Sequence, residues 1–259
     1  MGSLPYSQCG KQGFTEKMGT EFTLNGVSCH RGGRRILHGI SLDIADIETV
    51  SLLGPSGAGK TSLLRLLNGL DEYSEGTISF EGKEIRDIPI RELRKRVGMV
   101  FQLPALFDGT VRENILFGPS LWGETADPEA LLRRVGLPSD LIDRPSNELS
   151  VGQQKRVSLA RTLANNPHVV LMDEPTANLD AASAARILEL VRSLRDEIGV
   201  AVIMVSHLIQ DAETLGGHTA ILHEGRLVEF GPTDRVLNDP SSDITRQYLD
   251  GKLEPAQES

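Results

Sequence analysis

The chain has 259 residues, enough for one large domain with a substantial buried core. Apolar residues make up 39% and charged residues 24% of it, a balance typical of a globular protein and unlike collagen or a disordered chain. Asp and Glu number 36 against 27 Lys and Arg, so the formal net charge is −9 and the long-range field opposes a phosphate backbone. Nucleic acid is therefore not an expected partner.

The two ends of the chain carry few structural signals. Residues 1–20 are polar and Gly-rich, without the apolar core of a signal peptide, and residues 251–259 lack any apolar period. We expect a flexible N-terminal segment at 1–20, a working domain at 21–250 and a polar tail at 251–259. The longest apolar runs fall far short of the ~20 residues that span a bilayer, so a membrane role is expected to need another chain. The two cysteines, Cys9 and Cys29, suit a reducing compartment.

Short β-type runs come first along the working domain. Phe22 to Ile44 and Thr77 to Ile85 are punctuated by Gly32-Gly33 and by Glu81-Gly82. Such turns between β-type runs are typical of antiparallel hairpins. The pattern predicts an N-terminal β subdomain.

Three other runs are almost wholly apolar: Val50 to Leu53, Val169 to Met172 and Ala201 to Val205. Continuous apolarity over so few residues is typical of a strand covered on both faces, as in a parallel α/β sheet. A buried helix is the weaker alternative, because each run is too short for one.

A glycine-rich segment follows the first apolar run and precedes a helix-like pattern. It matches G-x-x-x-x-G-K-[ST] with Gly54, Pro55, Ser56, Gly57, Ala58, Gly59, Lys60 and Thr61, and Ser62 follows. Glycines allow such a loop to aim backbone N–H groups at phosphate oxygens. Lys60 is predicted to reach the β- and γ-phosphates, and the Thr61 hydroxyl to ligate Mg²⁺. A chance match in a glycine-rich turn is the alternative, and the flanking strand and helix patterns argue against it.

The pattern between Ile88 and Leu163 is helical. Asp127 and Pro128 mark the start of one helix, which Gly136 ends. We expect an inserted helical subdomain at approximately 88–165. No internal repeat and no heptad stretch long enough for a coiled coil is present in the sequence.

Two acidic residues, Asp173 and Glu174, follow the second apolar run. Unpaired charge is costly at the end of a buried strand, so a metal ion and a reacting water would explain both. Asp173 is predicted to hold Mg²⁺ and Glu174 to polarise the water that attacks the γ-phosphate. A solvated loop would be the better interpretation if the pair stood alone, without the strand and the phosphate loop.

Leu149-Ser150-Val151-Gly152-Gln153 lies upstream of the acidic pair, and with it the sequence resembles the ABC ATPase family. The segment looks like that family's signature motif. The resemblance further implies a Q-loop glutamine, matched by Gln102, which also meets Mg²⁺, a D-loop aspartate, matched by Asp180, and a switch histidine, matched by His207. Alone, a glutamine or a histidine would be weak support, and it is the order of the motifs that supports these two.

The sequence departs from the family pattern at three places. Val151 stands where the signature commonly has glycine, His30 stands where an aromatic residue usually stacks on adenine, and Ile47 replaces a usual glycine. Since Ser150 and Gly152 remain, binding through the signature is expected to survive. An imidazole can still stack, so His30 is retained as an ATP-binding prediction.

The fold implied by the resemblance is a P-loop NTPase (RecA-like) α/β core with an antiparallel β subdomain and an inserted helical subdomain. Two ATP molecules with Mg²⁺ would be held between two copies of the chain, each contacted by the phosphate loop of one copy and by Ser150, Gly152 and Gln153 of the other. The catalytic residues would be Glu174, His207 and Gln102. The dimer would hydrolyse ATP and drive a separate membrane permease from the cytoplasmic face, through the region from Gln102 to Phe107.

Several alternatives remain open. Val151 and the segment from Phe101 to Phe107 look similar to bacterial iron-export and plant aluminium-tolerance ABC ATPases, and an importer ATPase for phosphate or amino acids is the runner-up. A non-transport ABC ATPase, such as one for iron-sulfur assembly, is the alternative from another class. A P-loop kinase or GTPase would leave the signature segment and His207 unexplained.

Overall fold

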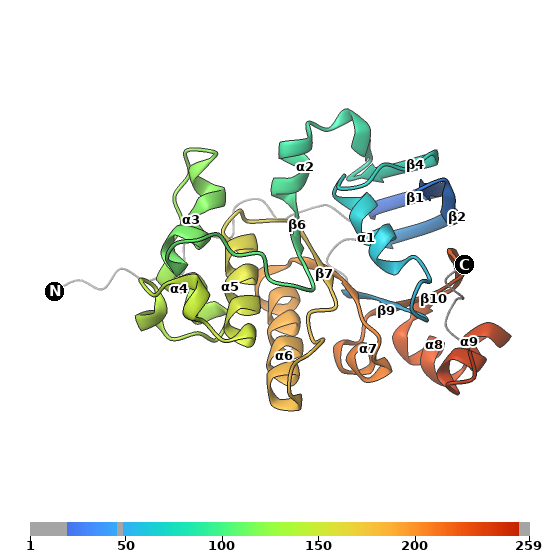
Figure 1. The fold of residues 1–259 in the computed structure, drawn as a ribbon. Coiled ribbons are helices and arrows are strands. Elements are labelled where there is room, and N and C mark those ends of the chain that lie inside the picture. The colour runs from blue at the N-terminus through green and yellow to red at the C-terminus, as the bar shows by residue number, and fades with distance from the viewer. Residues whose placement is uncertain (1–19, 46–48, 254–259) are drawn as a thin grey trace.

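The computed structural model describes residues 20–45 and 49–253. Ile47, nearly all of the N-terminal segment and most of the polar tail lie outside these ranges. Within them the chain forms a four-stranded sheet and a six-stranded sheet, with helices on both sides of the larger one (Figure 1). The architecture is the α/β fold that the sequence predicts.

The smaller sheet is antiparallel. It comprises β1 (Thr20–Arg31), β2 (Arg34–Ala45), β4 (Glu75–Phe80) and β5 (Lys83–Glu84), in the order β2-β1-β4-β5. Gly32 and Gly33 turn the chain between β1 and β2, and Glu81 and Gly82 between β4 and β5, all with positive φ. Two-residue turns of this kind match the twist of a hairpin, so both predicted hairpins are confirmed.

The larger sheet is mainly parallel. Strands β3 (Thr49–Leu53), β6 (Val97–Val100), β7 (Val169–Asp173) and β8 (Ala201–Val205) run in one direction, in the order β3-β8-β7-β6. Strand β9 (His218–His223) is parallel to β3, and β10 (Arg226–Pro232) is antiparallel to β9. Every residue of β3, β7 and β8 is buried, as their apolar sequences predict. Residues that follow these strands therefore gather at one edge of the sheet.

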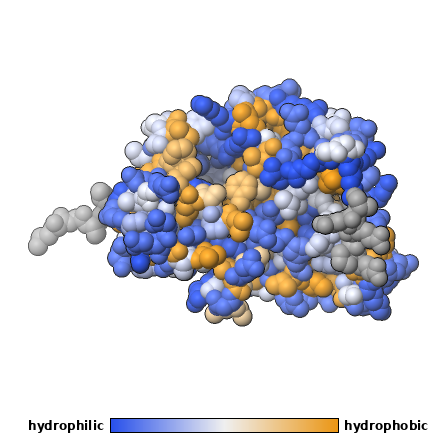
Figure 2. All heavy atoms as spheres, viewed as in Figure 1, coloured by the Kyte–Doolittle hydropathy of each residue, from blue (hydrophilic) through white to orange (hydrophobic). Residues whose placement is uncertain are grey.

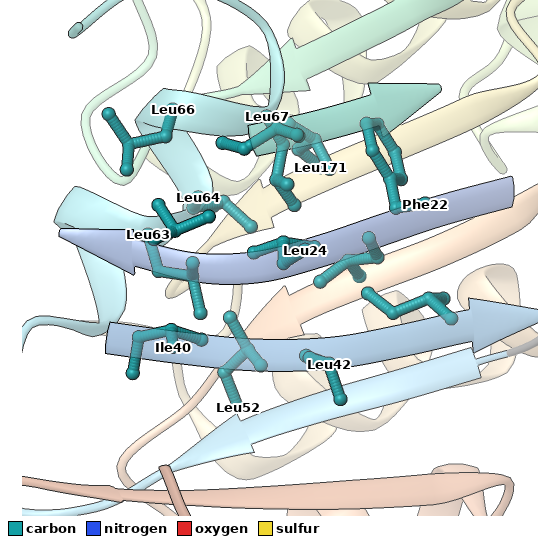
Figure 3. Packing of buried hydrophobic residues seen from close by; sticks show 14 of the residues in the cluster. Phe22, Leu24, Ile40, Leu42, Leu52, Leu63, Leu64, Leu66, Leu67 and Leu171 are labelled. Atoms are coloured by element: carbon teal, nitrogen blue, oxygen red, sulfur yellow. The ribbon is translucent and has the colours of Figure 1, made fainter. Parts of the chain in front are cut away.

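Helix α1 (Lys60–Leu67) is held between the two sheets. Figure 3 shows its leucine side chains beside Phe22 and Leu24 of β1 and Leu171 of β7. The helix leucines that are at most 1% exposed are Leu63, Leu64, Leu66 and Leu67. This packing fixes the start of α1, where the glycine-rich loop ends.

A group of helices lies beside the edge strand β6 (Figure 1). Helix α2 (Ile90–Arg96) leads into β6, and α3 (Val111–Ser120), α4 (Pro128–Arg134) and α5 (Val151–Leu163) share a second core. Asp127 accepts a hydrogen bond from the Ala130 N–H, so it is the predicted N-cap of α4. The range 88–165, predicted to be helical, also contains the strand β6. The sequence does not reveal this strand, because four residues between helical patterns are too few to show a strand period.

The remaining helices follow the core strands. They are α6 (Ala181–Ile198), α7 (Ile209–Leu215), α8 (Thr233–Asn238) and α9 (Asp243–Leu249). Short 3-10 helices occur at Ile85–Asp87, Ser139–Leu141 and Ser146–Glu148. Across 20–45 and 49–253, none of the helices combines the length and the apolarity needed to cross a bilayer.

Candidate functional site

The predicted phosphate loop connects β3 to α1 and includes two glycines at which any side chain would be strained. Gly54 has φ 141°, and a Cβ there would lie 2.0 Å from the carbonyl oxygen of Leu222. Gly59 has φ 95° and is the N-cap of α1, and no side chain caps the first N–H groups of this helix. Unpaired N–H groups at a helix start are donors for phosphate oxygens. Of the other predicted loop residues, Ala58 is buried, Ser56 and Gly57 are exposed, and Pro55 and Ser62 are half-buried.

Lys60 lies inside this loop and is only 5% exposed. Its Nζ donates to the carbonyl oxygens of Gly54, at 2.7 Å, and Pro55, at 2.9 Å. Burial lowers the pKa of Lys60 to about 8, although the carboxylates of Glu174 and Asp173 oppose the shift. The loop thus holds a buried amine next to unpaired N–H donors, which suits the binding of a phosphate group.

Thr61 and Asp173 form an all-oxygen pair beside the loop. Thr61 Oγ1 donates to Asp173 Oδ1 at 2.9 Å. Burial raises the pKa of the Asp173 carboxyl, and the hydrogen bond from Thr61 works against this shift. A hydroxyl and a buried carboxylate in contact are ligands that Mg²⁺ prefers, and the cation would balance the buried charge. The donor set therefore fits the predicted metal site.

The three predicted catalytic side chains meet at the ends of neighbouring strands. Glu174 directly follows β7, while Gln102 and His207 each lie two residues beyond β6 and β8. Gln102 Nε2 donates to Glu174 Oε2 at 2.8 Å, and His207 Nε2 lies 2.5 Å from Glu174 Oε1. Glu174 has φ 46°, in the left-handed region that favours glycine. A carboxylate aimed in this way suits the activation of a water molecule next to a bound phosphate.

Gln102 was predicted both as a catalytic residue and as a metal ligand. Among the hydrogen bonds of the described residues, its amide contacts Glu174, and none joins it to Thr61 or Asp173. The structure therefore brings Gln102 to the predicted base, and the proposed metal pair consists of Thr61 and Asp173.

The predicted signature residues begin helix α5. Ser150 and Gln153 form a capping box, in which the Gln153 N–H donates to Ser150 Oγ at 3.3 Å and the Ser150 N–H donates to Gln153 Oε1 at 2.9 Å. Ser150 is exposed, and Val151 is 53% exposed. A Cβ on Gly152 would meet Leu179 at an ordinary 3.8 Å, so the described residues give no steric reason for glycine there.

The chain does not bring the signature residues to its own phosphate loop. Figure 1 shows α5 and α1 on opposite sides of β6 and β7. Asp180 likewise stands at the exposed N-cap of another helix, α6, where its carboxylate accepts from the Ser183 N–H at 2.9 Å. Hydrogen bonds from Ser183 lower the pKa of Asp180. Both helix starts are therefore exposed to a partner.

His30 lies near the end of β1, opposite Arg35 of β2. It is exposed, and its Nδ1 is 2.9 Å from Ser74 Oγ. This hydrogen bond holds one ring nitrogen, so stacking of the imidazole on adenine stays a prediction. Ile47, the third departure from the family pattern, is outside the described residues.

Lys155 is a residue that the sequence motifs did not single out. It lies two residues after Gln153, is 4% exposed, and donates from Nζ to the carbonyl oxygens of Pro175 at 3.0 Å and Ala177 at 2.7 Å. Burial lowers the pKa of Lys155, and the charge of Glu174 opposes this shift. Lys155 thus links the start of α5 to the loop between Glu174 and Asp180. A buried lysine within a polar helix turn leaves no pattern that the sequence alone would reveal.

A second group of possible metal ligands lies at the opposite end of β7. Ligand atoms of Glu21, Glu81 and His168 lie within 4.8 Å of one another. Glu81 is already bound by Arg96 and by His168, whose Nδ1 lies 2.6 Å from Glu81 Oε1. Burial opposes the shift, but the hydrogen bonds from Arg96 and His168 lower the pKa of Glu81. We therefore interpret the group as a network of polar contacts that joins the end of β4 to the larger sheet.

Comparison with known proteins identifies proteins of similar sequence. Residues 37–177 match the family described as ABC transporter. Protein STAR1 of Oryza sativa subsp. japonica is 39% identical over 246 residues, which cover 93% of this chain and 71% of that protein. A protein of Haloferax volcanii named "Probable anion import ATP-binding protein" is 39% identical over 243 residues, or 86% of this chain and 84% of that protein.

Solved structures of related sequence share the fold. The structure of cbiO1 from Clostridium perfringens, described as part of the ABC transporter complex cbiONQ, matches with a TM-score of 0.77 and 30% identity, covering 85% of this chain and 92% of that one. The dimeric ATP-binding cassette MJ0796 in a post-hydrolysis state, bound to ADP and Pi, matches with a TM-score of 0.73 and 30% identity, covering 82% and 98%.

Proposed function

The chain belongs to the ABC transporter family as an ATP-hydrolysing subunit, and on this premise we propose that it works as a head-to-tail homodimer driving a separate membrane permease. The ATP-binding domain would span residues 21–250, with the helical subdomain at approximately 88–165. The dimer would sit on the cytoplasmic face of the membrane through its contact with the permease.

One observation carries the proposal of a shared site. Lys60, Thr61 and Glu174 lie at one edge of the parallel sheet, whereas Ser150 lies at an exposed helix start beyond β6. A helix N-terminus binds anions through its unpaired N–H groups. A second copy, turned head to tail, would present its Ser150 to the nucleotide on the first copy. The dimeric state of the MJ0796 structure supports this arrangement.

In the proposed mechanism the chain's own residues divide the work on ATP. Backbone N–H donors of the loop between Ser56 and Thr61 and the Lys60 ammonium bind the β- and γ-phosphates. Mg²⁺, held by Thr61 and Asp173, would neutralise charge on these phosphates. Glu174 polarises the attacking water, and its contacts with Gln102 and His207 orient the carboxylate. Hydrolysis removes the γ-phosphate contacts that favour the closed dimer.

A hydrophobic surface next to Gln102 is the proposed contact for the permease. Large apolar side chains exposed in this stretch are Leu103 at 75%, Phe107 at 47%, Phe117 at 45%, Leu121 at 67% and Trp122 at 41%. The Phe107 and Phe117 rings lie 4.5 Å apart between centroids, and a hollow of about 1010 Å³ adjoins Trp122 and α2. Figure 2 shows hydrophobic side chains over α3 on this face. So concentrated an exposed apolar surface is typical of a protein contact.

Isolation from membranes tests the proposed contact. The full chain is expected to co-purify with a polytopic membrane protein, and Leu121→Asp is expected to abolish this by placing a charge in the hydrophobic surface. Ile244→Asp, at a residue 36% exposed on α9, is the matched control and should still co-purify. Recovery of only non-membrane partners with the wild-type chain would favour the iron-sulfur assembly alternative.

The cargo has two candidates. Val151 and the segment from Phe101 to Phe107 favour metal export, through the resemblance to iron-export ATPases. The Haloferax volcanii relative, which is named for anion import, favours uptake of an anion such as phosphate. Transport assays on vesicles containing the dimer and its permease distinguish them, because export and import move the cargo in opposite directions for ATP on the same side.

A further inference from the structure

Asp211 is a buried carboxylate that belongs to none of the family motifs. It lies in the first turn of α7 and is 3% exposed. Its Oδ2 accepts two short hydrogen bonds, from Thr176 Oγ1 at 2.7 Å and from Ser206 Oγ at 2.6 Å. Water competes little for hydrogen bonds that are buried to this extent. Asp211 therefore links the segment that contains Thr176 to the segment that contains Ser206.

These two segments are the ones that carry the proposed catalytic pair. Thr176 lies two residues after Glu174, and Ser206 directly precedes His207. Thr176 is 7% and Ser206 is 2% exposed, so water does not compete for either hydroxyl. The Leu208 N–H also donates to Ser206 Oγ at 3.0 Å, which holds the chain on both sides of His207. Besides the backbone hydrogen bond from the Glu174 N–H to the Val205 carbonyl oxygen, the loops after β7 and β8 are thus joined through the Glu174–His207 contact and through Asp211.

We propose that Asp211 is a positioning residue that sets the placement of His207 against Glu174. The inference rests on the proposed roles of these two residues in ATP hydrolysis. Without the Asp211 carboxylate, the hydroxyls of Thr176 and Ser206 lose their shared acceptor, so the residues after Glu174 and before His207 are held together less firmly. Reacting groups displaced by as little as about 1 Å lose much of their catalytic effect.

Glu229 provides a matched control for a purely structural role. This carboxylate on β10 is 6% exposed and accepts hydrogen bonds from Ser241, Ser242 and Arg235. It joins β10 to the segment before α9, and none of these contacts involves the catalytic loops. Removal of either carboxylate leaves buried donors without a partner, so both variants are expected to lower the melting temperature. Only Asp211 should affect His207.

Nuclear magnetic resonance of the histidine rings measures this placement without nucleotide. The His207 signals are identified by their loss in His207→Ala. In Asp211→Ala they are expected to move towards their positions in Glu174→Ala, because both variants break the contact between His207 and Glu174. In Glu229→Ala they should keep their wild-type positions. Wild-type His207 signals in folded Asp211→Ala would overturn the proposal.

Kinetics of the full chain give a second measurement. Asp211→Ala is expected to lower kcat by about 10- to 100-fold while KM for ATP changes by less than about twofold, because Asp211 does not touch the phosphate loop. Adding Asp211→Ala to His207→Ala should cause little further loss, since residues that act through one contact are not additive. An equal loss of kcat in Glu229→Ala, or full additivity with His207→Ala, would mean a general structural effect.

Milder variants cover the case in which Asp211→Ala does not fold. Thr176→Val removes one hydrogen bond, and Ser206→Ala removes two, because Ser206 Oγ also accepts from the Leu208 N–H. Each variant is expected to lower kcat by about threefold to tenfold. Asp211→Asn keeps an oxygen acceptor and should retain more activity than either. Wild-type kcat in both Thr176→Val and Ser206→Ala would contradict the proposal. Normal hydrolysis by Glu174→Gln would instead refute the proposed catalytic roles, so the two failures are distinguishable.

Discussion

The edge of the parallel sheet and the start of helix α5 are both predicted to bind ATP, yet they are built differently. At the sheet edge the polar side chains contact one another: Lys60 contacts its own loop, and Glu174 is held by Gln102 and His207. At the start of α5, Ser150 is exposed, and its hydrogen bonds to the described residues stay within its own helix turn. The first region gathers most of the side chains that we propose bind the phosphates, while the second is an exposed helix end that we propose contacts another chain.

Helix α3 sharpens the contrast, because it begins with a capping box of the same kind. Thr110 and Glu113 pair there as Ser150 and Gln153 do in α5. The two helix starts are therefore equivalent in local geometry, and only the second lies in the segment that resembles the family signature. The local structure of a helix start therefore does not distinguish a cap that only stabilises the helix from a cap that also binds a ligand.

The largest effect on ATP turnover is expected from a substitution at the sheet edge. Glu174→Gln removes the proposed base and keeps its size, so turnover of ATP should fall by about 10² to 10⁴ while ATP still binds. Steady-state phosphate release and nucleotide affinity, measured on the same preparation, check both statements. Near-normal hydrolysis would exclude Glu174 as the base.

Lys60→Ala should weaken nucleotide binding by about 10- to 100-fold, the usual worth of a hydrogen bond to a charged group. Calorimetry with Mg²⁺ and ATP measures the dissociation constant. Lys252→Ala is the control, because Lys252 is exposed and pairs only with Asp250 in the described part of the chain. An unchanged constant in Lys60→Ala would show that the loop does not hold the phosphates.

Ser150→Ala and Thr110→Ala separate the two capping boxes. Each should lower the free energy of unfolding by about 1 kcal/mol, as the loss of an N-cap does. Only Ser150→Ala is expected to weaken ATP-dependent dimerisation, by about tenfold, because one charge-assisted hydrogen bond to the partner's nucleotide is lost. Light scattering in a Glu174→Gln background measures the dimer. Equal dimerisation by both variants would refute the role of Ser150.

The smallest expected effect is a pH dependence at Lys60. Its pKa is lowered to about 8 by burial, and phosphate prefers the protonated amine, so ATP affinity should fall by about twofold between pH 7 and pH 8. Without nucleotide the sign reverses: the folded chain loses this proton more readily than the unfolded chain, so stability gains from about pH 8 upward. Binding at several pH values checks the first effect, and Lys60→Ala should abolish it.

Local sequence predicts the parts of the site that lie within one segment. The strands β3, β7 and β8 and the glycine-rich loop each have a complete pattern of their own, and the motif order then places Gln102 and His207. Contacts between distant segments leave no such pattern. Lys155 reaches Ala177 and Thr176 reaches Asp211 only after the sheet has brought their elements together. Strand β6 was missed for the related reason that its partner β7, rather than its own four residues, defines it.

The backbone of Glu174 has a further consequence for how this sequence can change. A φ of 46° costs a side-chain-bearing residue about 1–3 kcal/mol, which glycine would recover. Where this gain exceeds the loss of the contacts with Gln102 and His207, selection for thermostability favours a change at the position where hydrolysis would be lost. An ancestral or engineered chain optimised for heat resistance alone would tend to become a nucleotide-binding protein that no longer turns over.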